Sequence, residues 1–206
     1  MGMEGVLLKQ AEEALRPYYK KVYEDAPKSS KIIMEHCGIS GACGLIPAPG
    51  IDLAVMASSN IVMFGRLNKV LGISLSKNTS RVLGKFACSL IAGNLASIPI
   101  TMIAGVGGSI LKLIPGVGTA LGAVMTCGAY AACTYVAGIV YLKALAKTAQ
   151  NGPVTEEALK ESLKEEFSDK AQFARLFKEG KTATKGMNFD DFKSRAKEVK
   201  EEEARD

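Results

Sequence analysis

Apolar side chains recur every three or four residues along most of the 206-residue chain, and no stretch alternates apolar and polar residues as a half-buried strand does. This pattern predicts an all-α protein built as a helical bundle. Proline, glycine and capping residues divide the chain into segments. We expect helices over residues 4–24, 31–43 and 51–72, from 79 into an uncharged run, from 115 to 149, and from starts at Thr155, Ser168 and Asn188.

Several of these boundaries depend on single residues. Pro17 is expected to strain or break the first helix, and the sequence DAPKSS to end it. The next helix then begins at Lys31, capped by one of the two preceding serines. Gly180 is expected to stop the helix that starts at Ser168.

Two runs without any charged residue occupy the middle of the chain. They span residues 86–111 and 113–142, and Lys112 alone separates them. Each run is longer than the ~20 residues that a helix needs to cross a bilayer. A helix without a charged face has to be enclosed on every side by protein or by lipid. The sequence therefore predicts a central, apolar, Gly/Ala-rich helical hairpin that associates with a membrane; the alternative is a soluble bundle that hides the hairpin.

No Asp or Glu lies between Asp52 and Glu156, so acidic residues are confined to the two ends of the chain. The net charge of +5 arises from residues 1–150, whereas the charges of residues 151–206 nearly balance. We interpret these parts as a helical membrane-associated domain and a charged helical C-terminal tail. The basic excess is diffuse and not interleaved with aromatic residues, so we expect no nucleic-acid partner.

Basic residues flank the two uncharged runs, and their placement indicates how the chain would be oriented in a membrane. Under the positive-inside rule this placement predicts an integral or tightly associated membrane protein with both termini in the cytoplasm. Residues 1–26 are strongly charged and lack an apolar core, so we expect no secretory signal peptide. The flanking residues are Lys77, Arg81 and Lys85 before the first run, and Lys143 and Lys147 after the second.

Small side chains form a stripe at helical spacing in the second uncharged run. Such a stripe lets two helix backbones approach closely, within the chain or between copies of it, and it therefore suggests a homo-oligomer. The alternative is that glycine and alanine are simply common in apolar helices. The stripe comprises Gly118, Gly122, Thr126, Ala129 and Cys133.

Asp52 lies at the start of an expected helix and is followed by more than a hundred residues without another carboxylate. One interpretation is a helix-start charge that the helix dipole stabilises. The other is a buried charge that pairs with a basic residue such as Arg66 or Arg81, or that lines a pathway through a membrane.

The sequence offers little for catalysis. Its one histidine, His36, stands beside Cys37 and near Cys43, but these three residues have neither the number nor the spacing of a zinc site. No acid, base and nucleophile cluster along the chain, and the phosphate-binding motif G-x-x-x-x-G-K-[ST] does not occur in it. We therefore expect no enzymatic activity, no cofactor and no metal site.

Two segments with the same Pro/Gly device carry a family resemblance. LIPAPGIDLAVM, followed some sixty residues later by KLIPGVGTALGAVM, resembles the YcjF-like family of unknown function over residues 31–147. The resemblance implies a helical membrane-associated domain that works beside a GTPase domain, which here would be a separate protein. The matching positions are Ile46, Pro47, Pro49 and Asp52, then Ile114, Pro115, Gly116, Gly118, Thr134 and Gly138.

Together these observations favour a membrane-embedded helical scaffold or adaptor that recruits a soluble partner, with a separate GTPase as one candidate. A pore-forming or channel-like oligomer is an alternative, although the hairpin offers few polar residues to line a lumen. A third interpretation is a soluble bundle that shields the apolar hairpin until it meets a membrane or an apolar ligand.

Overall fold

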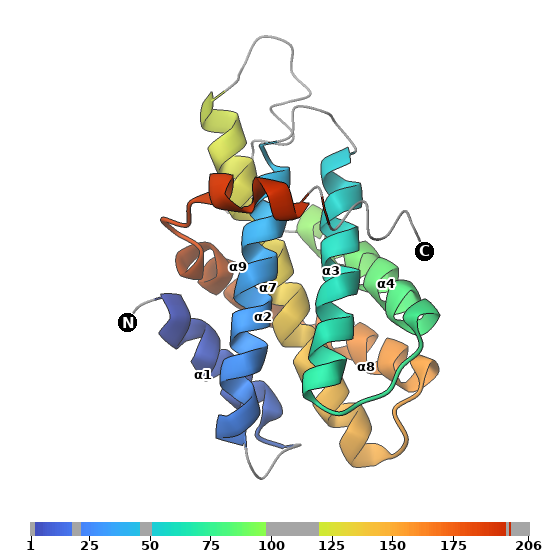
Figure 1. The fold of residues 1–206 in the computed structure, drawn as a ribbon. Coiled ribbons are helices and arrows are strands. Elements are labelled where there is room, and N and C mark those ends of the chain that lie inside the picture. Colours follow the sequence, from blue (N-terminus) through green and yellow to red (C-terminus); the bar gives the residue numbers. More distant parts are fainter. Residues whose placement is uncertain (1–2, 18–21, 46–50, 98–119, 197, 199–206) are drawn as a thin grey trace.

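The computed structural model describes residues 3–17, 22–45, 51–97, 120–196 and 198, and these fold as a bundle of helices (Figure 1). No strand occurs among the described residues, so the all-α prediction is confirmed. The elements in chain order are α1 (Met3–Leu15), α2 (Val22–Cys43), α3 (Ile51–Val70), α4 (Lys77–Ser97), α7 (Ala120–Asn151), α8 (Glu156–Ser168), α9 (Lys170–Ala183) and the 3₁₀-helix η1 (Phe189–Phe192).

The long helix α7 forms the centre of the bundle. Figure 1 shows it running the length of the molecule, and α1, α2, α3, α8 and α9 all pack against it. Its segment Cys127–Asn151 is long and apolar enough to cross a membrane by length and composition, yet 94% of the most apolar window is buried inside the bundle. The expected enclosure of the second uncharged run is thus provided by protein from Cys127 onward.

The first uncharged run is only partly described, because α4 ends at Ser97 and residues 98–119 lie outside the described part of the chain. Within α4, Leu83, Ala87 and Ile91 are buried, and the helix packs against α3 and α8. Lys85 and Ser89 on its other side are exposed. The described arm is therefore an amphipathic helix of the bundle, and the expected turn at Lys112 is not among the described residues.

Two predicted helix boundaries are wrong here, the end at DAPKSS and the start at Lys31. DAPKSS does not end a helix, because α2 runs unbroken from Val22 to Cys43 with Pro27 inside it. Pro27 is the sixth residue of α2, past the four N–H groups that lack partners within the helix, so it removes one helical hydrogen bond. Packing compensates for this loss, since Ala26, Ser29 and Ser30 are buried. Contacts of α2 with α1 and α7 therefore decide a boundary that local propensity does not.

The prediction that Gly180 stops a helix is also wrong, because α9 continues to Ala183. A Cβ atom placed on Gly180 would lie 3.1 Å from the Cα of Ala132 in α7. This glycine therefore permits two helices to approach closely. The glycine with left-handed backbone lies further on, at Gly186 with φ +84°.

The predicted helix starts in the C-terminal part are confirmed by their capping hydrogen bonds. Thr155 Oγ1 accepts from the backbone N–H of Ala158, and Asp169 Oδ1 accepts from that of Gln172. α8 and α9 pack their apolar faces on α7, so the described part of the predicted tail shares one core with the rest of the bundle. The boundary between residues 150 and 151 stays a prediction.

Candidate functional site

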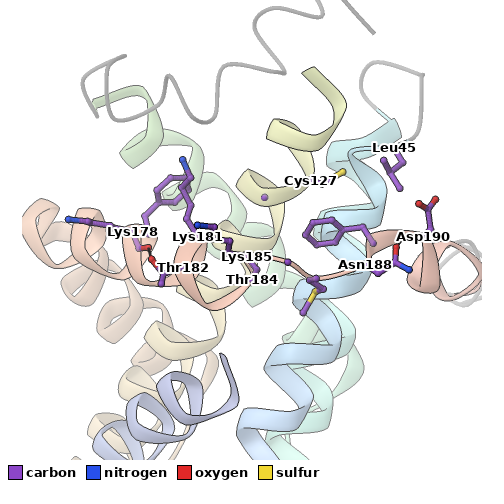
Figure 2. Close-up of a pocket in the computed structure, with 14 residues that line it drawn as sticks. Leu45, Cys127, Lys178, Lys181, Thr182, Thr184, Lys185, Asn188 and Asp190 are labelled. Carbon is purple, nitrogen blue, oxygen red and sulfur yellow. Dashed lines mark hydrogen bonds between the residues drawn. The ribbon is translucent and has the colours of Figure 1, made fainter. Parts of the chain in front are cut away.

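A pocket of about 860 Å³ opens at the end of the bundle where α2 ends and α7 begins (Figure 2). Its apolar surface comes from four elements: Phe177 on α9, Cys127 on α7, Leu45 after α2, and Phe189 on η1. Phe177 and Cys127 are buried, and the other two are half-buried. The volume lies in the range of sites that hold small organic ligands, roughly 300–1,000 Å³.

Three lysines stand along one side of this pocket. Lys178, Lys181 and Lys185 follow one another at spacings of three and four along α9 and the turn after it. Figure 2 shows them together on one side, with Asn188 and Asp190 on the opposite side. Asp190 pairs with Lys193 at 2.5 Å, so its charge is compensated within η1 and the residue after it. The pocket therefore combines an apolar lining with a positive side.

The far wall of the pocket is η1, which rests on glycines of α2. A Cβ atom on Gly41 would meet the ring of Phe189 at 2.1 Å, and one on Gly38 would meet the ring of Phe192 at 2.6 Å. Asn188 caps η1 by accepting from the backbone N–H of Asp190. Because these two glycines have no side chain, η1 can pack directly against α2 and form this wall of the pocket.

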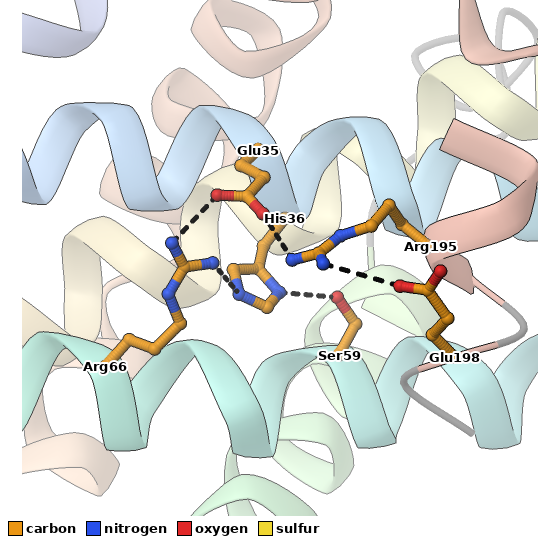
Figure 3. Close-up of polar contacts among 6 residues, drawn as sticks. All are labelled: Glu35, His36, Ser59, Arg66, Arg195 and Glu198. Carbon is orange, nitrogen blue, oxygen red and sulfur yellow. Dashed lines mark hydrogen bonds and ion pairs between the residues drawn. The ribbon is translucent and has the colours of Figure 1, made fainter. Parts of the chain in front are cut away.

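A polar cluster joins α2, α3 and the segment after η1 (Figure 3). Arg66 donates from Nη2 to Glu35 Oε2 at 2.8 Å and from Nη1 to His36 Nε2 at 3.2 Å. Arg195 donates from Nη2 to Glu35 Oε1 at 2.9 Å. Two guanidinium groups therefore share one carboxylate. Burial alone would raise the pKa of Glu35, but the hydrogen bonds and charges of Arg66 and Arg195 bring it below its ordinary value.

The cluster fixes the proton of His36. A guanidinium group can only donate, so Nε2 accepts, the proton lies on Nδ1, and Nδ1–H donates to Ser59 Oγ at 2.9 Å. Burial, together with the charge of Arg66, lowers the pKa of His36 to about 3. Because this imidazole resists protonation and Ser59 is fully buried, the pair does not form a general base with a reachable nucleophile. The cluster is a structural connection between helices.

Of the predicted packing stripe, only Ala129 and Cys133 have described side chains. Both are buried, and Cys133 lies close enough to Cys37 of α2 to affect the pKa of that thiol. Gly118 lies outside the described residues, as do the surroundings of Gly122 and Thr126 in the first turns of α7. The stripe as a whole stays a prediction.

Asp52 falls in the first turn of α3, where a helix-start charge was expected, but its side chain is not among those described. Arg66 pairs with Glu35 and lies about 20 Å further along the same helix at 1.5 Å per residue. The suggested pairing of Asp52 with Arg66 or Arg81 stays a prediction, because the side chain of Asp52 is not described. The roles of Asp52 as a buried charge or a pathway residue stay predictions.

Sequence reasoning missed the lysines of the pocket. Their spacing is visible in the sequence, because residues three and four apart would share one face of a helix, although α9 itself ends before Lys185. The surrounding segment is rich in charges of both signs, so three lysines on one side did not indicate a binding site. The apolar lining opposite them comes from residues distant in the chain, and the sequence alone could not show that they lie together.

Comparison with known proteins adds a family and a relative. The sequence model described as "Domain of unknown function (DUF697)" matches residues 12–172, a longer span than the expected resemblance and one that crosses the predicted boundary at 150. "Magnetosome membrane protein 22" of Magnetospirillum gryphiswaldense is 26% identical over 155 residues, which cover 75% of this chain and 76% of that protein. No solved structure matches the chain significantly.

Proposed function

This chain belongs to the DUF697 family of domains of unknown function, and from that premise we propose that it is a membrane-associated helical adaptor. The bundle stays folded beside the bilayer, one end attaches it, and its outer charged helices recruit a soluble protein. The relative named as a magnetosome membrane protein supports the membrane part of the proposal.

The burial of α7 is the observation that supports a bundle that stays folded beside the membrane. From Cys127 onward the most apolar helix already has protein around it, so it does not need lipid. The sequence before it remains uncharged through residues 98–119 except for Lys112. We assign membrane contact to that segment, which joins Ser97 of α4 to Ala120 of α7. Figure 1 shows α7 beginning at the end of the bundle where α2 ends and α3 begins.

A fractionation experiment tests this assignment. The full chain is expressed, and cell extract is separated into soluble, carbonate-released and carbonate-resistant membrane fractions. We expect the chain with the membranes, and we expect I103E combined with I110E to move most of it into the soluble fraction, because a charged side chain in the bilayer is costly.

The matched control introduces the same two charges where the structure is exposed. Ser168 at the end of α8 and Ala171 in the first turn of α9 are both exposed, so charges introduced there stay in water. S168E with A171E should leave the distribution unchanged. A wild-type chain found wholly in the soluble fraction would refute the proposal, and a membrane-bound I103E/I110E variant would refute the assigned segment.

The adaptor role rests on the outer surface of α8 and α9. Their inner faces pack on α7, whereas Glu157, Glu161, Lys164 and Glu165 of α8 are exposed. A surface with charges of both signs is suited to reversible docking of a soluble protein. A separate GTPase is one candidate, as the family resemblance implies, and a second copy of the chain is another. Crosslinking through a photoreactive residue at position 161, followed by identification of the captured chain, tests which of the two binds; capture of neither would refute the docking role.

The basic residues around the uncharged runs support an orientation with both termini on the cytoplasmic side. Protease added outside sealed right-side-out vesicles should then leave both terminal tags intact. Removal of either tag would overturn this orientation.

A second candidate is a bundle that shields α7 until it meets a membrane. The observation that favours it is the same burial, because a helix with the composition of a membrane span lies inside a bundle. A pore is less well supported: Thr134, one of the few polar residues of this helix, donates to Ser40 Oγ at 2.8 Å inside the bundle and so does not line a lumen.

A further inference from the structure

We propose that the pocket between α9, η1 and the start of the buried part of α7 binds one anionic phospholipid. Lys178, Lys181 and Lys185 would contact the phosphate, and the apolar lining would receive an acyl chain. This inference rests on the proposed membrane association and names the lipid class that the attached end of the bundle recognises.

The charge of the pocket points to an anion. Lys178 and Lys185 are exposed, Lys181 is half-buried, and no described acidic residue pairs with any of them. Asp190 on the opposite side is paired with Lys193. Three cations that pair with none of the described acidic residues stand on one side of a hollow and attract an anionic group, and ammonium groups are common phosphate ligands.

The lining points to a ligand that is apolar beyond its charged group. Phe177 and Cys127 are buried at the pocket wall, and Met187 is half-buried beside the lysines in the chain. Gly128 adds space, because a Cβ atom placed there would have no heavy atom within 4 Å. A hydrophilic anion would leave this apolar surface in contact with water, whereas an anionic amphiphile covers it and meets the lysines at the same time.

Two other segments of this chain fit less well by composition. Residues 98–119 are apolar but carry one charge, Lys112, which is positive and repels the lysines. Residues 199–206 contain three consecutive glutamates, but their only apolar side chains are the small ones of Val199 and Ala204. Neither combines an anion with apolar bulk, so charge complementarity favours a lipid.

The absence of tryptophan from the chain allows a direct test. In the full chain, M187W places a sole tryptophan at the pocket. Its fluorescence is recorded while short-chain phosphatidylglycerol with brominated acyl chains is added below its micelle concentration, and the same titration is run with brominated phosphatidylcholine. We expect saturable quenching by phosphatidylglycerol, with an affinity at least tenfold higher than for phosphatidylcholine, and no binding of glycerol phosphate at the same concentrations.

Two variants in the M187W background separate the charge from the lining. Changing the three pocket lysines to glutamine should weaken phosphatidylglycerol binding at least tenfold. A control triple removes the same net charge at exposed lysines outside the pocket and should bind as before. G128L should abolish quenching by filling the open space, without lowering the melting temperature. The control triple is K85Q, K164Q and K170Q, all at exposed positions.

Several results would overturn the inference. Equal quenching by the two lipids, or equal losses in the pocket triple and the control triple, would show that the lysines do not select an anion. Undiminished quenching in G128L would place the ligand elsewhere, and a lower melting temperature in G128L would show that the chain itself fills the pocket.

If no lipid quenches the tryptophan while the chain still floats with phosphatidylglycerol vesicles, the pocket inference fails and membrane association stands. If quenching occurs but the chain neither floats nor fractionates with membranes, the proposed function fails instead.

Discussion

At the scale of single residues, His36 shows how neighbours set the chemistry of a side chain. In the sequence it stands beside Cys37 and near Cys43, in a spacing that does not match a zinc site. In the structure it accepts from Arg66, donates to Ser59 and is almost fully buried. A cation held at Nε2 blocks the position that a second proton would occupy. The contact with Arg66 thus keeps the histidine neutral.

This environment predicts a pH dependence of stability. The pKa of His36 is lowered from 6.5 to about 3 on folding, so between these values the unfolded chain binds a proton that the folded chain does not. The contribution of neutral His36 to the free energy of unfolding is full above pH 6.5. It falls by about 1.4 kcal/mol for each pH unit below that value. From pH 7 to pH 5, urea unfolding should show about 2 kcal/mol more loss in the wild type than in H36Q.

The chain has a single histidine, so no second imidazole complicates this comparison. The lowered pKa of Glu35 acts in the same direction, but only below its ordinary value of 4.5, outside the measured range. Parallel pH profiles for the wild type and H36Q would contradict the proposed neutral histidine.

At the scale of elements, the packing of α2 on α7 depends on two glycines: Gly44, which the sequence did not single out, and Gly138, which it marked only as a position of the family resemblance. A Cβ atom on Gly44 would lie 2.7 Å from the backbone nitrogen of Cys127, and one on Gly138 would lie 2.7 Å from the Ile33 side chain. Backbone cannot move aside as a flexible side chain does, so Gly44 sets the distance between the end of α2 and the buried part of α7.

Substitution of Gly44 tests this contact. G44A should lower the free energy of unfolding by about 1–3 kcal/mol, because the added methyl group forces two helices apart. The matched control is G65A in α3, where nothing lies within 4 Å of an added Cβ. Alanine favours the helix there, so stability should rise by up to about 1 kcal/mol. Urea unfolding of both variants is the measurement, and equal stabilities would show that α2 and α7 do not touch at Gly44.

At the scale of the whole molecule, the bundle encloses a helix that by composition could have met lipid. Six of the described helices contact α7, and four of the five cysteines lie buried around this core while Cys88 is half-buried. Burial raises the pKa of the Cys37 thiol, which lowers its reactivity further. Thiol reactivity therefore reports whether the bundle is closed.

A closed bundle predicts slow labelling. In the native full chain, a thiol reagent should modify Cys88 first and the other four thiols only on denaturation, as followed by absorbance and peptide mapping. Vesicles of phosphatidylglycerol should not change this order if the bundle stays folded beside the membrane. Rapid labelling of Cys37 on vesicle binding would instead show that α7 leaves α2, which would favour the shielded-hairpin candidate over the adaptor with a closed bundle.

The sequence by itself determined the features that depend on near neighbours. Helical periodicity gave the all-α class, and caps at Thr155, Asp169 and Asn188 fixed helix starts, because each cap bonds to a backbone N–H two or three residues away. The uncharged run over residues 113–142 required an enclosed helix, since none of its side chains is charged.

Only the tertiary structure decided which residues contact each side chain across the bundle. Protein and lipid impose the same apolar pattern on a helix, so the sequence could not show that α7 is enclosed by protein from Cys127 onward. Pro27 and Gly180 read as helix ends locally, but contacts with other helices carry α2 and α9 through them. The three lysines of α9 and the turn after it line an apolar pocket whose other residues come from distant parts of the chain. The protonation state of His36 is set by a guanidinium group thirty residues away. Contacts over such separations are set by packing geometry, which no local pattern encodes.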